Sequence, residues 1–416
     1  MAPSANDKRI IGDLVKRVDE ISSKPENDEK NLLWLKANSL KPEDRRYRPP
    51  VYVSIHDFSG DYEGGYLPVP TLECEDPDFR DYELKLRYVL YRYKLIPDDL
   101  PVEKPVYRVD KTINGWGDWG VNWKRSERAG KGGSWKFEPV ITRKSQLETL
   151  KTPVLAYDAE DTEKKYRKAL DLFGEITDVV LANKAIWPSF HLMGEWCLFR
   201  GLEQVMTDMY DDPEFLHSAM RIIADGNMSR ALQAEKMGIL SNGGVWVKAE
   251  EFRRREGDES NLTLKDIFTF VEAQELTLVS PEMHKEFALQ YERPIAESFG
   301  LCTYGCCEDL TNKLDDLFEI KNLRQIGVTP WADTETCAYR INTEYGVSWR
   351  PNPAHLAGGY DRDHIRGYLR QNLEALRKNG CACHVFLKDI HSCGGSPERF
   401  TEWTLICKEE IQRLWG

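Results

Sequence analysis

The alternation of apolar and polar stretches predicts most of the structure beyond Thr152. Short apolar runs of strand length are followed there by segments with helical spacing, and this order repeats to the end of the chain. Strands that alternate with helices of about 10–15 residues indicate βα units and a parallel sheet. A stretch of this length is about one eight-stranded barrel, which usually takes roughly 250 residues. We therefore predict an α/β fold, with a (β/α)8 TIM barrel as the catalytic domain over residues 151–416.

Individual elements of this barrel follow from local signals. Residues 176–182 form an apolar run that is expected to be the first barrel strand, and residues 238–244 form a run that ends in a turn. Asp212, Pro213 and Glu214 predict the start of a helix, because an acidic cap followed by proline is typical of a first turn. Leu198–Tyr210 and the segment from Ser280 are further expected helices, and residues 323–328 and 384–390 are further expected strands.

The first 150 residues follow a different pattern. Residues 9–21 are amphipathic with helical spacing, and residues 51–55 alternate as a strand does. Tryptophans then stand among glycines, which predicts hairpins that cap something larger. These tryptophans are expected to be packing anchors, with a lid over a pocket as the alternative. We predict an N-terminal helical arm and an α+β extension over residues 1–150; the tryptophans are Trp116, Trp119, Trp123 and Trp135.

Composition and charge narrow the class of protein. The 57 Lys and Arg residues against 69 Asp and Glu residues give a net charge of −12, and no basic cluster of the kind that binds a phosphate backbone stands out. Nucleic acid is therefore not an expected partner. No run approaches the ~18 apolar residues of a membrane span, and the polar start lacks a signal-peptide core. We expect a cytoplasmic protein whose ten cysteines are reduced thiols or ligands. A homodimer is compatible with the sequence, which does not fix the oligomeric state.

Two apolar runs end in soft metal ligands. Residues 300–308 finish in the adjacent thiols Cys306 and Cys307, and residues 385–395 contain His391 and Cys393. In a parallel barrel the carboxyl ends of the strands share one face, where a metal site would form. Adjacent strand residues point to opposite faces, so both thiols converge only if Cys307 already belongs to a turn. Packing of the cysteines in the core is the alternative.

Other polar residues also follow expected strands. His191 and Glu195 lie after the first expected strand, where a carboxylate four residues beyond a histidine can orient it or act as an acid. Two carboxylates follow the apolar run 267–271, and aromatic, arginine and amide side chains follow later strands, where they would suit a ring and a carboxylate. The expected substrate-binding residues are Asn242, Glu272, Glu275, Trp331, Trp349, Arg350 and Asn352. Cys381, Cys383 and His384 lie at a strand start and are expected to be structural.

Several longer motifs resemble one family. They are Gly194-Glu195-Trp196, the stretch 211–217, the stretch 279–287 with Arg293-Pro294-Ile295, and residues 392–400. Together with the Cys306-Cys307 strand end, they are similar to the uroporphyrinogen decarboxylase superfamily. The Asp118-Trp119-Gly120-Val121 turn is similar to its longer, methyltransferase-like members. The match runs in order from about residue 116 to 412.

The resemblance implies a (β/α)8 barrel with one of two chemistries. The decarboxylases of the superfamily act on porphyrinogens without metal or cofactor. The methyltransferases exchange methyl groups with a corrinoid protein in one-carbon metabolism, and the coenzyme M branch holds zinc through a His-x-Cys element and a C-terminal cysteine. Here Tyr304-Gly305-Cys306 takes the place of His-x-Cys, so the histidine is missing. Cys307 or His391 would replace it, and Cys393 matches the third ligand.

The functional hypothesis is a zinc-dependent methyltransferase of a corrinoid (cobamide) system. It would act on a small methyl donor or acceptor such as an O-methylated compound, as in O-demethylation, with His191, Glu195 and Tyr304 as catalytic candidates. No corrinoid-binding domain is visible, so a separate corrinoid protein is the expected partner. One alternative is a metal-free decarboxylase or lyase that uses Arg350, Glu195 and His191, although the Arg45–Pro49 cluster does not match the arginine motif of the decarboxylases. Another is a non-enzymatic binding subunit or structural metalloprotein.

Overall fold

The computed structural model of the protein describes residues 4–55, 71–127, 136–183, 189–241, 244–255 and 261–416. The chain forms two compact units. Unit 1 comprises Met1–Lys111, Ala159–Ala182 and Trp349–Gly416, and unit 2 comprises Thr112–Asp158 and Asn183–Ser348. The chain thus passes between the units several times and does not divide once near residue 150. No helix in the described part of the chain combines the length and apolar character needed to cross a membrane.

Seven strands form a large sheet in the order β1-β13-β12-β11-β10-β9-β8. The pairs β1–β13, β8–β9, β9–β10 and β10–β11 are parallel, as the strand and helix alternation predicts. The sheet is therefore barrel-like, and the described strands do not close it into an eight-stranded ring. Its strands are β1 (Val51–Val53), β8 (Ser189–Phe190), β9 (Phe268–Val271), β10 (Leu301–Tyr304), β11 (Leu323–Val328), β12 (Gly346–Trp349) and β13 (Ala382–Leu387).

Two expected barrel strands differ in the structure. The apolar run 176–182 forms β7 (Val179–Ala182), which pairs with β2 (Tyr107–Asp110) outside the large sheet. Leu181 on β7 is exposed, whereas all four residues of β9 are buried. Residues 239–241 form no strand. The chain turns there after Gly238 takes a positive φ of 62°. Leu181 leaves β7 open to solvent on one side, which an inner parallel strand is not, whereas residues 239–241 are buried without forming a strand.

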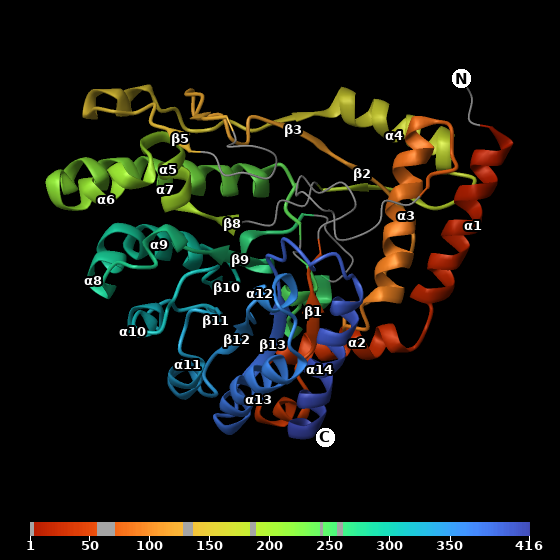
Figure 1. The fold of residues 1–416 in the computed structure, drawn as a ribbon. Helices are drawn as coiled ribbons and strands as arrows, with labels where there is room; N and C mark the ends of the chain where they lie inside the picture. Colours follow the sequence, from red (N-terminus) through yellow and green to blue (C-terminus); the bar gives the residue numbers. More distant parts are fainter. Residues whose placement is uncertain (1–3, 56–70, 128–135, 184–188, 242–243, 256–260) are drawn as a thin grey trace. The chain divides into compact units, whose positions relative to one another are not determined.

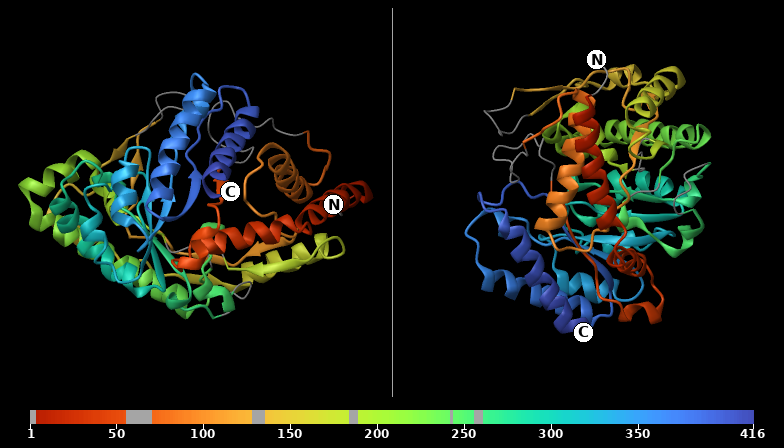
Figure 2. Two further views of the ribbon diagram at one scale, coloured as in Figure 1. Left: turned by 90° about the horizontal axis from the view of Figure 1, so that it is seen from below. Right: turned by 90° about the vertical axis from the view of Figure 1, so that its right-hand side faces the viewer.

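The core of unit 1 includes the contact between α1 (Ala5–Ser22) and α3 (Pro77–Leu95), which lie side by side in Figures 1 and 2. Ile11 and Leu14 on α1 pack with Phe79 on α3 and with Phe173 at the end of α4. The amphipathic stripe over residues 9–21 is therefore confirmed as helix. The remaining helices of unit 1 are α2 (Glu26–Ala37), η1 (Pro42–Arg46), α4 (Ala159–Phe173), α12 (Ala354–Ala357), α13 (Arg362–Lys378) and α14 (Glu398–Trp415).

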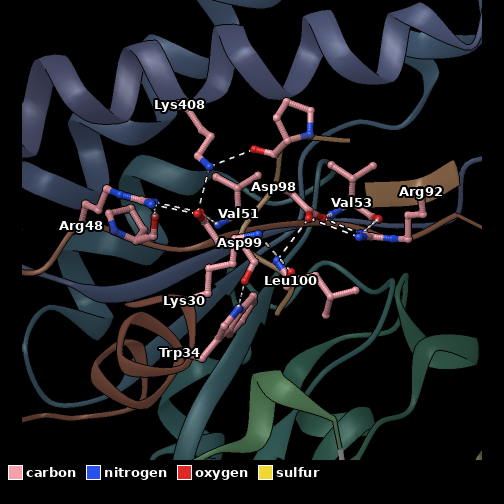
Figure 3. Close-up of polar contacts among 12 residues, drawn as sticks. Lys30, Trp34, Arg48, Val51, Val53, Arg92, Asp98, Asp99, Leu100 and Lys408 are labelled. Atoms are coloured by element: carbon pink, nitrogen blue, oxygen red, sulfur yellow. Dashed lines mark hydrogen bonds and ion pairs between the residues drawn. The ribbon is translucent and has the colours of Figure 1, made fainter. Parts of the chain in front are cut away.

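The free edge of β1 is covered by two aspartates (Figure 3). The backbone N–H of Val51 donates to Asp99 Oδ2 at 2.8 Å, and that of Val53 donates to Asp98 Oδ2 at 3.0 Å. Unpaired strand N–H groups must find acceptors, and an open edge invites pairing with another chain. The two carboxylates take the place of a neighbouring strand on this side of β1.

Cations surround both aspartates in unit 1. Arg48 donates two hydrogen bonds of 2.8 Å to the Asp99 carboxylate, and Lys408 Nζ lies 2.9 Å from it. Arg92 pairs with Asp98 at 2.6 Å. Burial alone would raise the pKa of Asp99, but its bonds to Arg48 and the charge of Lys408 hold it below the usual value. The Asp99 carboxylate is thus held in its ionised form, and both aspartates at the edge are paired with cations.

Unit 2 contains the longest helix and the strand ends of interest. Asp212 caps α7 (Pro213–Lys236), and Ser280 caps the helix from Pro281, as predicted. The expected single helix over Leu198–Tyr210 is interrupted at Gly201, whose φ of +82° ends α5 and starts α6. The other helices are α5 (Leu192–Arg200), α6 (Leu202–Asp211), α8 (Pro281–His284), the π turn η7 (Lys285–Leu289), α9 (Gln290–Ser298), α10 (Leu314–Leu317), α11 (Thr334–Ile341), η2 (Lys144–Thr149), η3 (Val245–Val247), η4 (Glu250–Arg255), η5 (Leu264–Asp266) and η6 (Gln274–Leu276).

The Trp- and Gly-rich stretch folds within unit 2 as two antiparallel strand pairs. Trp119 is buried against α7, so closely that a Cβ atom at Gly226 would lie 2.2 Å from its ring. Trp119 is therefore a packing anchor, Trp123 is exposed, and Trp135 lies outside the described residues. The strands are β3 (Thr112–Asn114) with β6 (Ala156–Asp158), and β4 (Lys124–Arg125) with β5 (Phe137–Glu138).

Candidate functional site

The candidate site lies in unit 2, at the carboxyl ends of β8, β9 and β10, which are neighbours in the sheet (Figure 1). In barrels of parallel strands this end carries the functional loops. Polar side chains follow each of the three strands directly. They are Ser189 and His191 at β8, Glu272 and Glu275 after β9, and Cys306, Cys307 and Glu308 after β10.

A histidine and a carboxylate are paired across β8 and β9. The register pairs Phe190 with Val271, so the next residues of the two strands, His191 and Glu272, lie side by side. His191 Nδ1 is bonded to Glu272 Oε1, and His191 Nε2 lies 2.7 Å from Ser189 Oγ. Burial lowers the pKa of His191, but the bond to Glu272 outweighs it, so the pKa is raised above its usual value. A histidine held in this way can take up or release a proton near neutral pH.

Glu272 is fixed by its backbone surroundings. The residue is 1% exposed, and its Oε2 accepts a hydrogen bond of 2.7 Å from the Gln274 N–H. Its own N–H donates to the Phe190 carbonyl at 3.3 Å. One oxygen of the Glu272 carboxylate is therefore hydrogen-bonded to the backbone, and the other is hydrogen-bonded to His191. It was expected to contact substrate, and the structure places it behind the histidine.

Glu275 lies one helical turn further on and carries a perturbed acid group. Burial, followed by the charge of Glu272, raises the pKa of Glu275 to about 7. Its carboxyl group lies against the first turn of α5, where a Cβ atom at Gly194 would be 2.9 Å from Glu275 Oε1. A carboxyl group with this pKa is partly protonated at neutral pH and can serve as a proton donor.

Cys306 and Cys307 lie in the turn after β10, not in the strand. Gly305 takes a φ of +99° immediately after the strand ends at Tyr304. The two sulfur atoms are 3.6 Å apart, and both residues are half-buried. Two thiolates on one tetrahedral zinc ion, each bonded at about 2.3 Å, would be separated by about 3.8 Å. The condition that Cys307 belong to the turn is therefore met, and the pair fits two positions of a zinc site.

Glu308 connects this turn to the loop after β9. Its fully buried carboxylate accepts hydrogen bonds from the Cys306 N–H at 2.6 Å and from the Ala273 N–H at 3.3 Å. One side chain thus bonds the turn that carries the thiols and the residue that follows Glu272. The carboxylate thus links the turn that carries the thiols to the segment that carries Glu272, in addition to the pairing of β9 with β10.

The other two predicted ligands, Cys393 and His391, belong to unit 1. Cys393 is buried, and burial raises the pKa of its thiol. His391 is exposed. Within the described residues, no group of three or more His, Cys, Asp or Glu side chains is arranged as metal ligands. The four-ligand set remains a prediction, for which the structure supplies the geometry of the Cys306 and Cys307 pair.

Tyr304 belongs to a buried trio below the turn. Its hydroxyl donates to Glu292 Oε2 at 2.6 Å and lies 2.9 Å from His284 Nε2. All three side chains are fully buried. Burial raises the pKa of Glu292 to about 8 and lowers the pKa of His284 to about 3, so neither is charged at neutral pH. Tyr304 was predicted as a catalytic candidate, and in this position it supports the end of β10.

Glu195 contacts neither His191 nor Glu272 through its carboxylate. Its oxygens accept hydrogen bonds of 2.7 Å from Trp119 Nε1 and from Asn227 Nδ2, and Arg230 Nη2 lies 3.0 Å away. The guanidinium of Arg230 also lies over the ring of Trp119. Glu195 therefore fastens the Trp-rich segment to α5 and α7. The carboxylate that orients His191 is Glu272.

The predicted substrate-binding residues are dispersed. In unit 2, Trp331 is exposed, and Asn242 lies outside the described residues. In unit 1, Trp349 and Arg350 are buried, and the Asn352 side chain accepts a hydrogen bond from the Ala354 N–H. Burial and the charge of Arg350 lower the pKa of its neighbour His384 to about 3.

Sequence reasoning missed Ser189, His284 and Glu292. Ser189 and His191 are two residues apart in a stretch of extended chain, and such spacing tends to put both side chains on one face. The two-residue spacing of Ser189 and His191 can be read from the sequence alone. His284 and Glu292 fall on a helix amid apolar residues, and nothing in their spacing points to Tyr304.

Comparisons with known proteins support the fold. No protein family model matches the chain, and no curated protein sequence matches it. Among solved structures, it is similar to a methyltransferase from Methanosarcina mazei, with a TM-score of 0.51 and 12% sequence identity over 93% of this chain and 99% of that chain. At this identity the likeness shows a shared barrel-like α/β fold.

Proposed function

We propose that the chain is a methyltransferase component of a corrinoid-dependent system, with a zinc ion at the Cys306 and Cys307 turn. The observation that carries the proposal is the 3.6 Å separation of the two sulfur atoms at the end of β10. Thiolates are strong zinc ligands, and the two sulfur atoms are spaced as two ligands of one zinc ion would be. The fold shared with a methyltransferase agrees with this proposal.

The metal and the histidine pair would have different tasks. When bound, zinc would polarise the heteroatom that carries the methyl group. His191 would hold the proton that this oxygen needs as the methyl group departs, because Glu272 stabilises the charged imidazole. Glu275, with a pKa of about 7, would supply a second proton store beside it. Cys393, which the family resemblance names as a ligand, would complete the thiolate set.

The cobalt that accepts or donates the methyl group would be carried by a separate corrinoid protein. The spacing Asp-x-His-x-x-Gly of corrinoid-binding domains occurs at Asp389, His391 and Gly394. These residues follow β13 of the large sheet, and we assign them to the barrel-like fold and not to a separate corrinoid-binding domain. The substrate would be a small O-methylated compound, since the site offers a proton for a departing oxygen and a position for a soft Lewis acid.

The test is methyl transfer to free cob(I)alamin, used in place of the partner protein. Zinc-loaded protein is mixed with cob(I)alamin and a panel of alkyl and aryl methyl ethers, and methylcobalamin is followed by absorbance. The expected result is transfer that falls at least about 100-fold in His191→Gln, the usual loss for a general acid or base. Cys306→Ser should lose a similar factor.

The matched control is Cys302→Ala, on the same strand as the turn. Cys302 is fully buried, and burial raises the pKa of its thiol, so it is not a ligand. This variant should transfer methyl groups as the wild type does. Undiminished transfer by Cys306→Ser would contradict the zinc site, and a decarboxylase would be the better explanation if carbon dioxide were released instead.

A further inference from the structure

The side chains of Ser189, His191 and Glu272 form a continuous hydrogen-bonded row. Ser189 Oγ lies 2.7 Å from His191 Nε2, and His191 Nδ1 is bonded to the Glu272 carboxylate. We propose that Ser189 is a nucleophile and that this row gives the protein a second activity, acyl transfer from activated esters. A nucleophile within reach of a base, with the base oriented by a third group, is the recurring arrangement of such enzymes.

The backbone places the three groups at the ends of two paired strands. Ser189 lies in β8 and His191 directly follows it, and the 2.7 Å contact shows that the two side chains lie on the same side of the chain. The parallel register of β8 and β9 then puts His191 beside Glu272. Glu272 is held by the Gln274 N–H, so its free oxygen has a fixed direction. The row is therefore preorganised by strand pairing.

The polarity of the row suits proton removal from serine. Glu272 is a buried acceptor, so His191 presents N–H at Nδ1 and its lone pair at Nε2 toward the Ser189 hydroxyl. The raised pKa of His191 strengthens it as a base. Glu272 is 1% exposed, whereas the His191 side chain is 46% exposed. Ser189 is partly exposed, so a small ester can approach the imidazole and hydroxyl end of the row.

The chemical steps balance with an ester and water alone. Ser189 Oγ bonds to the ester carbonyl carbon and gives its proton to His191 Nε2. The bond to the ester oxygen breaks, and the departing alkoxide takes that proton. Water then adds to the acyl-serine, with one proton passing through His191 to the Ser189 oxygen. An acid and a serine hydroxyl are regenerated.

Two other described serines have different hydrogen-bond partners. Ser218 is also half-buried, but its hydroxyl donates to the Glu214 carbonyl at 2.7 Å. Ser39 bonds directly to the Asp44 carboxylate. Ser218 is therefore the matched control for Ser189.

Diisopropyl fluorophosphate tests the proposal on the full chain. Ser189 Oγ would displace fluoride from phosphorus, with its proton passing to His191. Intact mass and peptide mapping should show one label, on Ser189, in the wild type and in Ser218→Ala. Ser189→Ala should show none, and His191→Gln should be labelled at least about 100-fold more slowly. Glu272→Gln should be slowed by about 10-fold or more.

Mapping in the wild type decides the outcome even if a variant fails to fold. A label on any other residue, or no label at high reagent concentration, overturns the proposal. The Cys306→Ser and Cys307→Ser variants, which lack the proposed zinc ligands, should be labelled at the wild-type rate. Failure of the zinc hypothesis and failure of the serine hypothesis are thereby distinguished.

Discussion

At the scale of single residues, the site is defined by two carboxyl groups, Glu272 and Glu275, that lie in different surroundings. Glu272 has a backbone donor and a histidine, so it is held as an acceptor. Glu275 has burial and a neighbouring negative charge, which favour its neutral form. Unlike environments for nearby carboxyl groups are typical of acid and base pairs in active sites. The sequence predicted both residues at a barrel mouth but could not distinguish their roles, since these depend on contacts across strands.

Glu275 should cost the protein stability at alkaline pH. Its pKa is raised from 4.5 to about 7 on folding, so ionising it above pH 7 disfavours the folded state, and the cost disappears as pH falls toward 4.5. We predict that Glu275→Gln raises the free energy of unfolding by about 1–3 kcal/mol at pH 8. Urea denaturation at pH 8 and pH 5 measures the difference.

The gain should shrink at pH 5, where the wild-type carboxyl group is already protonated. Glu148→Gln, at an exposed position, is the control and should change little at either pH. A variant that is less stable than wild type at pH 8 would show that Glu275 is ionised and paired.

At the scale of elements, strand register determines which side chains meet at the site, and the strand edge of β1 is stabilised by aspartates. Helix starts at Asp212 and Ser280 were predicted because capping is a local signal. The pairing of β7 with β2 was not predicted, because an apolar run does not indicate which strand it will pair with. The position of His191 beside Glu272 also depends on register, and the sequence alone paired His191 with Glu195 instead.

The aspartates at the edge of β1 should be essential to that strand. Asp99→Asn removes the charge that faces Arg48 and Lys408 and weakens the acceptor of the Val51 N–H. Breaking a buried ion pair on one side usually costs about 3–5 kcal/mol, and we predict a loss near the lower end because both cations are partly exposed.

Chemical denaturation of the wild type and of Asp99→Asn at pH 7 measures this loss in the free energy of unfolding. The stabilisation by Asp99 should persist above its usual pKa and be lost as pH falls through its lowered pKa. Asp13→Asn removes an exposed pair with Arg9 and should cost about 0.5 kcal/mol or less. An equal loss in the two variants would mean that Asp99 does not hold the edge.

At the scale of the whole molecule, a large parallel sheet brings together residues that are far apart in sequence. Strand and helix alternation predicted this sheet, because βα units leave a repeated pattern. The same pattern did not reveal that β1, near residue 51, belongs to the sheet or that the chain divides into two units. Those features depend on pairings across hundreds of residues, for which a local pattern carries no signal.

The central claim is that the turn after β10 binds zinc through Cys306 and Cys307, and zinc content with X-ray absorption tests it most directly. The wild type and Cys302→Ala should each hold about one equivalent, with zinc–sulfur distances near 2.3 Å. Cys306→Ser and Cys307→Ser should lose most of it. Less than about half an equivalent in the wild type, or full zinc content in both serine variants, would contradict the claim.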